Sequence, residues 1–245
     1  HVRSRRQRQM CIRDSLNPDR PTVGITFPRS YWLEHNTAHI EALVTAVEEL
    51  DANTVPFFCL RLPDARRGNP GMAQVLENLL RDDEGRCVVD TLVDVHGMSM
   101  TAGVPANADA YPNLGVSVLH ALTSYAPRAA WQATAQGMGS MDVATQAAQP
   151  EFDGALITKL LATREADEVD DLTGAVVPRM VPVPGRAQAM AELALSWARL
   201  ARTPAGQRKV AIVFHHHPPR NDRIGCASGL DLSLIHISEP TRPLY

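Results

Sequence analysis

The sequence contains 245 residues, carries a formal net charge of −3 and is 44% hydrophobic. This length and apolar content suffice for the core of one or two domains. The near-neutral charge argues against a chain dedicated to nucleic acid or to a membrane surface, and no apolar run is long enough to span a bilayer. The four cysteines are scattered without a C-x-x-C pair, and no secretory signal is apparent. We therefore expect reduced thiols in a cytoplasmic protein.

The two ends of the chain differ in character from the rest. Residues 5–15 read RRQRQMCIRDS and residues 232–242 read LSLIHISEPTR, and neither stretch has helix or strand periodicity. Both resemble translated transposon-type sequencing adapters, because one DNA element read in opposite orientations encodes both MCIRDS and LSLIHI. The alternative is a basic N-terminal arm and a natural tail. We expect residues 1–15 and 232–245 to be adapter-derived and the remainder to be a piece of a longer protein.

Strands and helices alternate along the first hundred residues. The expected elements are a strand over 23–27, a polar turn over 28–31, a helix over 35–51 capped by Asn36, a strand over 53–60, a helix over 71–81 and a strand over 87–95. This order predicts an α/β fold, with a parallel sheet and flanking helices in flavodoxin-like or Rossmann-like units, truncated by the end of the sequence. Ligands of such sheets bind beyond the carboxyl ends of the strands, which here carry Arg29, Arg61 and His96.

The second half continues the same pattern less regularly. We expect a strand over 116–122, short helices over 126–135 and 141–148, a turn over 150–154, a strand over 155–161, an acidic loop over 163–173 and a helix over 185–202. The apolar stripe of the last helix is predicted to contain Met190, Leu193, Ala194, Trp197, Leu200 and Ala201. Residues 16–205 would form one α/β domain, and residues 206–231 would begin a second α/β unit.

The common enzyme motifs are missing. The sequence has no G-x-x-x-x-G-K-[ST] loop, no G-x-G-x-x-G after a strand, no G-x-S-x-G elbow and no H-E-x-x-H helix. We therefore expect no binding of ATP through a P-loop in this chain.

A strand starting at Val210 leads directly into a dense polar stretch, HHHPPRNDR. In an extended segment His215 and His217 share a face, so they could hold a divalent metal or act as bases; an exposed histidine run at a strand end is the alternative. The four residues 220–223, Arg-Asn-Asp-Arg, could bind a carboxylate, with Asp222 orienting the guanidinium groups. A surface turn with a local ion pair is the alternative.

His96 ends an apolar strand and precedes a glycine, which places it at a candidate site. A hydrogen-bonded histidine at a strand end explains the pattern equally well. Asp90 and Asp94 flank the same strand, and we interpret them as structural or capping groups.

Three stretches together resemble one family. They are PTVGITFPRSYWLEHNT from Pro21, GMGSMDVATQAAQPEFDGALIT from Gly137 and KVAIVFHHHPPRNDRIGCASGLD from Lys209. In this order they are similar to motifs of the cobaltochelatase large subunits of the CobN type, which are related to the H-type large subunit of magnesium chelatase. His216 and His217 stand where that family commonly has Asn and Tyr.

The resemblance implies a function. Such a subunit binds a tetrapyrrole and takes part in inserting Co²⁺ into hydrogenobyrinic acid a,c-diamide in cobalamin biosynthesis. ATP, with Mg²⁺, would be hydrolysed on separate AAA+ and integrin-like partner subunits, which agrees with the missing P-loop. The isolated piece is expected to be inactive. The alternatives are the magnesium chelatase large subunit, which has a porphyrin substrate, and a non-catalytic module that binds a tetrapyrrole or a metal.

Site residues follow from the same resemblance and the chemistry of the substrate. Loss of two ring N–H protons requires bases, for which the candidates are His215 and Asp222. Carboxylate arms would be held by substrate-binding residues, namely Arg220, Asn221, Arg223 and Arg29. Cobalt in transit accepts imidazole ligands, and the candidates are His215, His217 and His96.

Overall fold

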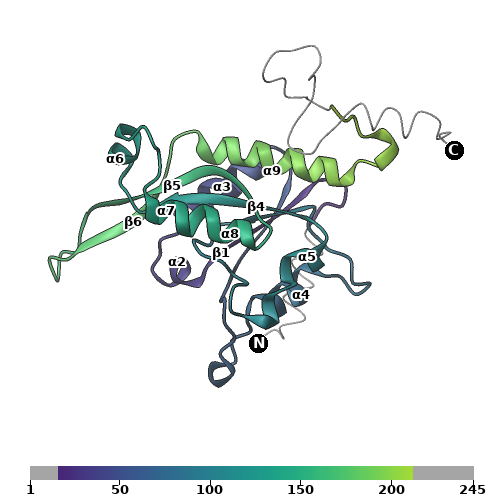
Figure 1. Ribbon diagram of the computed structural model, residues 1–245, viewed down its shortest axis with the longest axis horizontal. Coiled ribbons are helices and arrows are strands. Elements are labelled where there is room, and N and C mark those ends of the chain that lie inside the picture. Colours follow the sequence, from purple (N-terminus) through teal and green to yellow (C-terminus); the bar gives the residue numbers. More distant parts are fainter. Residues whose placement is uncertain (1–15, 212–245) are drawn as a thin grey trace, which may run out of the picture. The chain divides into compact units, whose positions relative to one another are not determined.

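The computed structural model describes residues 16–211, apart from the side chains of residues 167 and 168 (Figure 1). The chain divides into one unit that ends at Pro204 and another that begins at Ala205. In the second unit the described segment contains a 3₁₀ turn, η4 (Ala205–Gln207). None of the helices in the described part is long and apolar enough to cross a membrane.

A six-stranded sheet forms the centre of the first unit. Its strands are β1 (Thr22–Pro28), β2 (Asn53–Cys59), β3 (Thr91–Asp94), β4 (Ser117–Ser124), β5 (Leu156–Val169) and β6 (Val176–Pro182). Their order is β2-β1-β3-β4-β5-β6; the first five are parallel and β6 is antiparallel to β5. The order 2-1-3-4-5 is that of flavodoxin-like doubly wound sheets. The predicted α/β fold with a parallel sheet and flanking helices is therefore confirmed.

Helices cover both faces of the sheet (Figure 1). They are α2 (Arg29–Leu33), α3 (Ala38–Glu49), α4 (Met72–Leu80), α5 (Ala110–Leu114), α6 (Arg128–Ala133), α7 (Ser140–Asp142), α8 (Gln149–Phe152) and α9 (Arg186–Arg202). Short 3₁₀ turns are η1 (Ala65–Arg67) and η2 (Pro105–Asn107), and η3 (Val143–Ala148) is a π-helix.

Two apolar cores lie on opposite faces of the sheet. One packs α3 and α9 against the sheet, and the other packs α4 and α5. Neighbouring residues of β3 face different cores, Val93 the first and Leu92 the second, as the alternation of side chains along a strand requires. Burial on both faces is seen in β1, where six of the seven residues are buried, and in β3, where all four are buried.

The helix α3 begins later than the predicted helix over 35–51. Ile40, Leu43 and Val47 are buried on one face of this helix, which starts at Ala38 and follows Thr37. Asn36 is not its cap. The Asn36 side-chain oxygen instead accepts a hydrogen bond from the backbone N–H of Met180, at 2.8 Å, and so ties the start of α3 to β6.

The last long helix faces the core with a different stripe from the predicted one. Met190, Ala191, Ala194, Leu195 and Ala198 are buried. Leu200, predicted inside, is 45% exposed, and Ala201 is exposed too. Small alanines face the sheet because they let α9 approach it closely, a preference that apolar periodicity alone does not express.

The sequence prediction for the stretch after residue 161 is wrong. β5 continues to Val169 and returns as β6, where an acidic loop was expected over 163–173. Figure 1 shows this hairpin reaching beyond the main part of the sheet. Its turn is closed by Asp170, whose carboxylate accepts hydrogen bonds from the N–H and hydroxyl of Thr173. Charged residues resemble a loop in composition, but backbone pairing in an exposed hairpin does not require apolar side chains.

Other boundaries also differ. Residues 29–33 form the helix α2 instead of a turn, and β3 covers 91–94 instead of 87–95. The helix α5 lies between β3 and β4, where no helix is predicted. The expected helix over 141–148 is α7 followed by η3, and the expected turn after it begins with α8. The π turn inside this segment widens the helix, and such bulges are common at functional sites.

Candidate functional site at the carboxyl edge of the sheet

The carboxyl ends of β1 to β4 meet at one edge, where doubly wound sheets bind their ligands. Register sets which side chains meet there. Thr26 of β1 lies opposite Asp94 of β3, and Asp94 lies opposite His120 of β4. On the other side of β1, Pro28 lies opposite Cys59 of β2. Four strands thus bring polar and titratable groups from distant parts of the sequence to one place.

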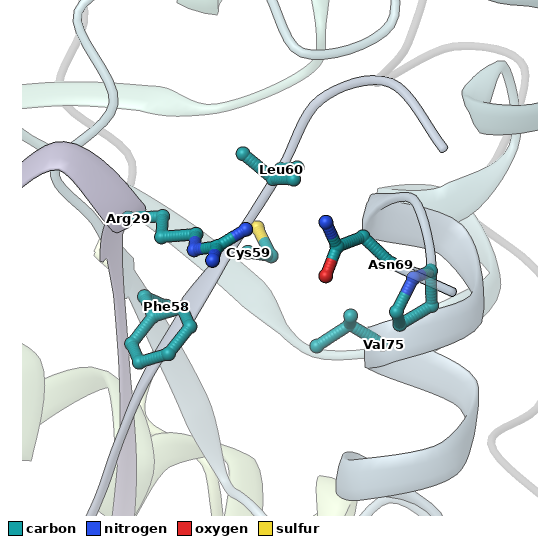
Figure 2. A pocket seen from close by; sticks show the side chains of 7 residues that line it. Arg29, Phe58, Cys59, Leu60, Asn69 and Val75 are labelled. Atoms are coloured by element: carbon teal, nitrogen blue, oxygen red, sulfur yellow. The ribbon is translucent and has the colours of Figure 1, made fainter. Parts of the chain in front are cut away.

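A pocket of about 280 Å³ opens at the ends of β1 and β2 (Figure 2). Its lining consists of Arg29, Phe58, Cys59, Leu60, Asn69, Pro70 and Val75. Figure 2 shows the Arg29 side chain reaching towards Cys59, with the amide of Asn69 facing them from the opposite wall. The pocket therefore combines a cation, an amide and a thiol with apolar walls, which suits a small ligand that carries negative charge.

Two aromatic side chains lie exposed beside this pocket. Trp32 of α2 is 58% exposed and Phe58 of β2 is 39% exposed. Their rings stack with centroids 6.2 Å apart and an interplanar angle of 26°. Phe58 also contacts Phe27 edge to face, at 6.3 Å. Exposed stacked rings offer an apolar surface to a flat ligand.

Asp94 is the centre of a buried polar cluster at the end of β3. Its side chain is 1% exposed. Oδ1 lies 2.6 Å from Nδ1 of His96 and accepts the His96 backbone N–H at 2.9 Å. Oδ2 accepts the hydroxyl of Tyr111 at 3.0 Å. Nδ1 of His120 lies 3.7 Å from Oδ2, too far for a hydrogen bond, and neither ring nitrogen of His120 has a hydrogen-bond partner among residues 16–211.

Charge pairing dominates the electrostatics of this cluster. Burial by itself would raise the pKa of Asp94, but the positive charge of His96 and the hydrogen bonds hold that pKa well below its ordinary value. Burial would likewise lower the pKa of His96, yet the Asp94 carboxylate raises it to about 10. Burial and the neighbouring Asp94 charge raise the pKa of Tyr111 well above its ordinary value. At neutral pH the cluster therefore holds an ion pair beside a neutral phenol.

Cys59 joins this cluster to the pocket. Its sulfur lies 3.7 Å from Nε2 of His96 and 3.5 Å from the hydroxyl of Thr26. Cys59, His96 and Asp94 thus form a row in which the imidazole lies between a thiol and a carboxylate. The two ring nitrogens of His96 both have protein partners, so a metal there would have to displace one of them. His96 is therefore better placed to exchange protons than to hold a metal.

The segment that follows β3 is held by polar side chains of the helical segment over 140–153. Asp153 accepts hydrogen bonds from the hydroxyls of Ser99 and Thr101 and from the N–H of Met100, at 2.5 to 2.6 Å. A side chain at Gly97 would collide with the amide of Gln146. The glycine after His96 thus leaves room for the buried Gln146 side chain.

The end of β4 is held in the same way. Asp142 accepts the hydroxyl of Ser124 at 2.5 Å and the N–H of Tyr125 at 3.2 Å, while Gln146 accepts the N–H of Thr123 at 3.2 Å. These residues belong to the stretch SMDVATQAAQPEFDG, so the polar positions of that motif fasten the edge of the sheet.

The structure describes only part of the predicted site. Arg29 lines the pocket and His96 lies in the buried cluster. The other predicted residues, His215, His217, Arg220, Asn221, Asp222 and Arg223, lie outside the described residues. Across residues 16–211 no group of three or more His, Cys, Asp or Glu side chains could hold a metal ion.

Sequence reasoning missed several members of the cluster. Asp94 was interpreted as structural, and Cys59, Tyr111 and His120 were not singled out. One signal was present, because Asp94 and His96 are two residues apart in an extended segment and so share a face. Tyr111 and His120 could be found only from the packing of α5 and the register of β4.

Strand order, helices on both faces and a polar edge define a flavodoxin-like α/β fold with a candidate ligand site at the carboxyl ends of its strands. Comparison with known proteins gives the family. The CobN/Magnesium Chelatase family profile matches residues 2–237, a range that includes parts of both terminal segments, whose adapter origin stays a prediction. The chain belongs to this family.

Individual relatives agree with this assignment. The chain is 29% identical over 226 residues to the aerobic cobaltochelatase subunit CobN of Sinorhizobium sp, which covers 92% of this chain and 17% of that protein. It is 28% identical to the H-type large subunit of the magnesium chelatase of Rhodobacter capsulatus, over 86% of this chain and 18% of that one. The solved catalytic subunit of cobaltochelatase from Mycobacterium tuberculosis matches with a TM-score of 0.64 and 28% identity, over 85% of this chain and 16% of that one. The chain thus spans about a sixth of the length of these relatives.

Proposed function

We propose that this chain is a piece of the tetrapyrrole-binding large subunit of a cobaltochelatase, which inserts Co²⁺ into hydrogenobyrinic acid a,c-diamide. The observation that carries the proposal is the family match over residues 2–237. The likeness of both fold and sequence to proteins named as cobaltochelatase subunits supports cobalt as the substrate metal. ATP and Mg²⁺ would act on AAA+ and integrin-like partner subunits in the cytoplasm.

The pocket of the described edge is too small for the whole substrate. Its volume of about 280 Å³ lies at the lower limit for small-molecule sites. A single carboxylate arm fits such a space, with Arg29 as its charge partner. The apolar face of the macrocycle would then lie over the stacked rings of Trp32 and Phe58.

The chemistry of insertion assigns roles to the polar stretch near the C-terminus. Two ring protons must leave as the metal enters, for which His215 and Asp222 are the proposed bases. Arg220, Asn221 and Arg223 would hold further carboxylate arms, and His217 would join His215 in passing Co²⁺ to the ring. Either His215→Ala or Arg220→Ala, made in the complete large chain, should reduce cobalt insertion at least about tenfold. Unchanged insertion in both variants would remove these assignments.

Substrate titration of the complete large chain tests the proposal. The corrin precursor and protoporphyrin IX are titrated separately, and binding is followed by tryptophan fluorescence. Arg29→Gln should weaken corrin binding about tenfold or more, since a charge-assisted hydrogen bond is worth about 1.5–3 kcal/mol. Arg66→Gln is the matched control, because Arg66 is exposed on η1 and is not among the residues that line the pocket. Failure of both tetrapyrroles to bind would overturn the function, whereas an unchanged Arg29→Gln would overturn only that residue's role.

The large subunit of a magnesium chelatase is the second candidate. The 28% identity to the Rhodobacter capsulatus protein favours it nearly as strongly as the cobalt relatives favour the first. Tighter binding of protoporphyrin IX than of the corrin precursor would select this candidate. Binding of a tetrapyrrole without metal insertion, even with the partner subunits and ATP, would identify a non-catalytic binding module.

A further inference from the structure

The cluster at the carboxyl edge contains a nucleophilic group that the chelatase function does not use. Cys59 is 4% exposed, yet it lines the pocket that Arg29 and Asn69 share. Behind it stand His96 and Asp94, with sulfur to Nε2 at 3.7 Å and Nδ1 to Oδ1 at 2.6 Å. We propose that Cys59 is a reactive thiol that forms covalent adducts with small electrophiles bearing a carboxylate, which enter through this pocket.

The order carboxylate, imidazole, thiol is an arrangement that activates a cysteine side chain as a nucleophile. A carboxylate fixes the imidazole and keeps it positively charged, and the imidazolium stabilises a neighbouring thiolate, which is the nucleophilic form of cysteine. The hydroxyl of Thr26, 3.5 Å from the sulfur, can donate a second hydrogen bond to it. Tyr111 from α5 and His120 from β4 face the Asp94 end of this row, and Arg29 from α2 faces the sulfur end.

Arg29 would give the pocket a preference for electrophiles that carry a negative charge. Its side chain reaches towards Cys59 in the same pocket (Figure 2). A carboxylate held there would bring its neighbouring carbon close to the sulfur. With iodoacetate as the probe, the thiolate sulfur forms a bond to the methylene carbon and the carbon–iodine bond breaks. Iodide leaves with the bonding electrons, and the thiol proton remains on Nε2 of His96 until it passes to water.

The chain contains its own reference thiol. Cys87 is also free and less buried than Cys59, but burial raises its pKa, and no imidazole is among the groups that shift it. Alkylation of the two residues is followed in the same sample of the full chain by mass spectrometry of peptides. At pH 7 Cys59 should react with iodoacetate at least about tenfold faster than Cys87, despite being more buried.

Two variants separate activation from charge preference. His96→Gln should slow alkylation of Cys59 at least about tenfold with both iodoacetate and iodoacetamide. Arg29→Gln should lower the iodoacetate rate about fivefold more than the iodoacetamide rate, as expected for one charge near the carboxylate of the probe. The Cys87 rate reports folding, because it should rise if a variant unfolds.

Clear outcomes would overturn the proposal. A Cys59 rate equal to or below that of Cys87 in wild-type protein would show that the thiol is neither activated nor reachable. An unchanged Cys59 rate in His96→Gln, with Cys87 still slow, would show that the imidazole does not act on it. If His96→Gln unfolds, the wild-type rate ratio and the Arg29→Gln result decide the matter by themselves. None of these results depends on tetrapyrrole binding.

Discussion

Tyr111→Phe is the sharpest test of the buried cluster, because it removes one oxygen atom and changes nothing else. The Tyr111 hydroxyl donates a hydrogen bond of 3.0 Å to Oδ2 of Asp94, and both residues are buried. A hydrogen bond to a charged group contributes about 1.5–3 kcal/mol. For a domain of this size, a loss of about 2 kcal/mol lowers Tm by roughly 4–8 °C.

Thermal unfolding at pH 7, followed by circular dichroism, measures this effect. Tyr125→Phe is the matched control, since Tyr125 is half exposed, and it should change stability by less than about 0.5 kcal/mol. The pKa shift of Asp94 also predicts how this stability difference changes with pH. The pKa of Asp94 is depressed in the folded state, so its stabilisation is present above the ordinary carboxyl pKa and is lost as pH falls. The difference between Tyr111→Phe and wild type should therefore shrink in acid. A Tyr111→Phe variant as stable as Tyr125→Phe would refute the cluster geometry.

Two further substitutions, Gly97→Ala and His39→Leu, test close packing at the site and the burial of a histidine in α3. Gly97→Ala should lower the free energy of unfolding, measured by urea titration, by about 1–3 kcal/mol. The added methyl group would collide with the Gln146 amide, which is held by its own hydrogen bond. Gly206→Ala is the control and should be neutral, because a methyl group there meets only open space. Burial lowers the pKa of His39 to about 4, so stability should fall by about 3 kcal/mol as pH drops from 6.5 to 4, where the unfolded chain takes up a proton that the folded chain does not. His39→Leu should remove that dependence, whereas His35→Asn, at an exposed position with positive φ, should retain it. A pH slope unchanged in His39→Leu would contradict the assignment.

Local periodicity was sufficient for the regular elements. The alternation of strand and helix patterns along the first hundred residues predicted a parallel sheet with flanking helices, which the structure confirms. Prediction from periodicity and composition failed where contacts between residues distant in sequence decide the structure. The β5–β6 hairpin carries acidic residues like a loop, yet backbone pairing holds it as a ladder. Asn36 has the chemistry of a helix cap, but its oxygen bonds to a strand 144 residues away.

The sequence by itself determined the class of fold and the family, because hydrophobic periodicity and short motifs are local properties of the chain. The tertiary structure alone decided which groups form the described site. Strand register brings Cys59 and Asp94 to Thr26 and His120, since a shift of one residue would turn each side chain to the opposite face of the sheet. The packing of α5 adds Tyr111 to the cluster. The perturbed pKa values of Asp94 and His96 follow from that convergence and from burial, neither of which is written in the spacing of residues along the chain.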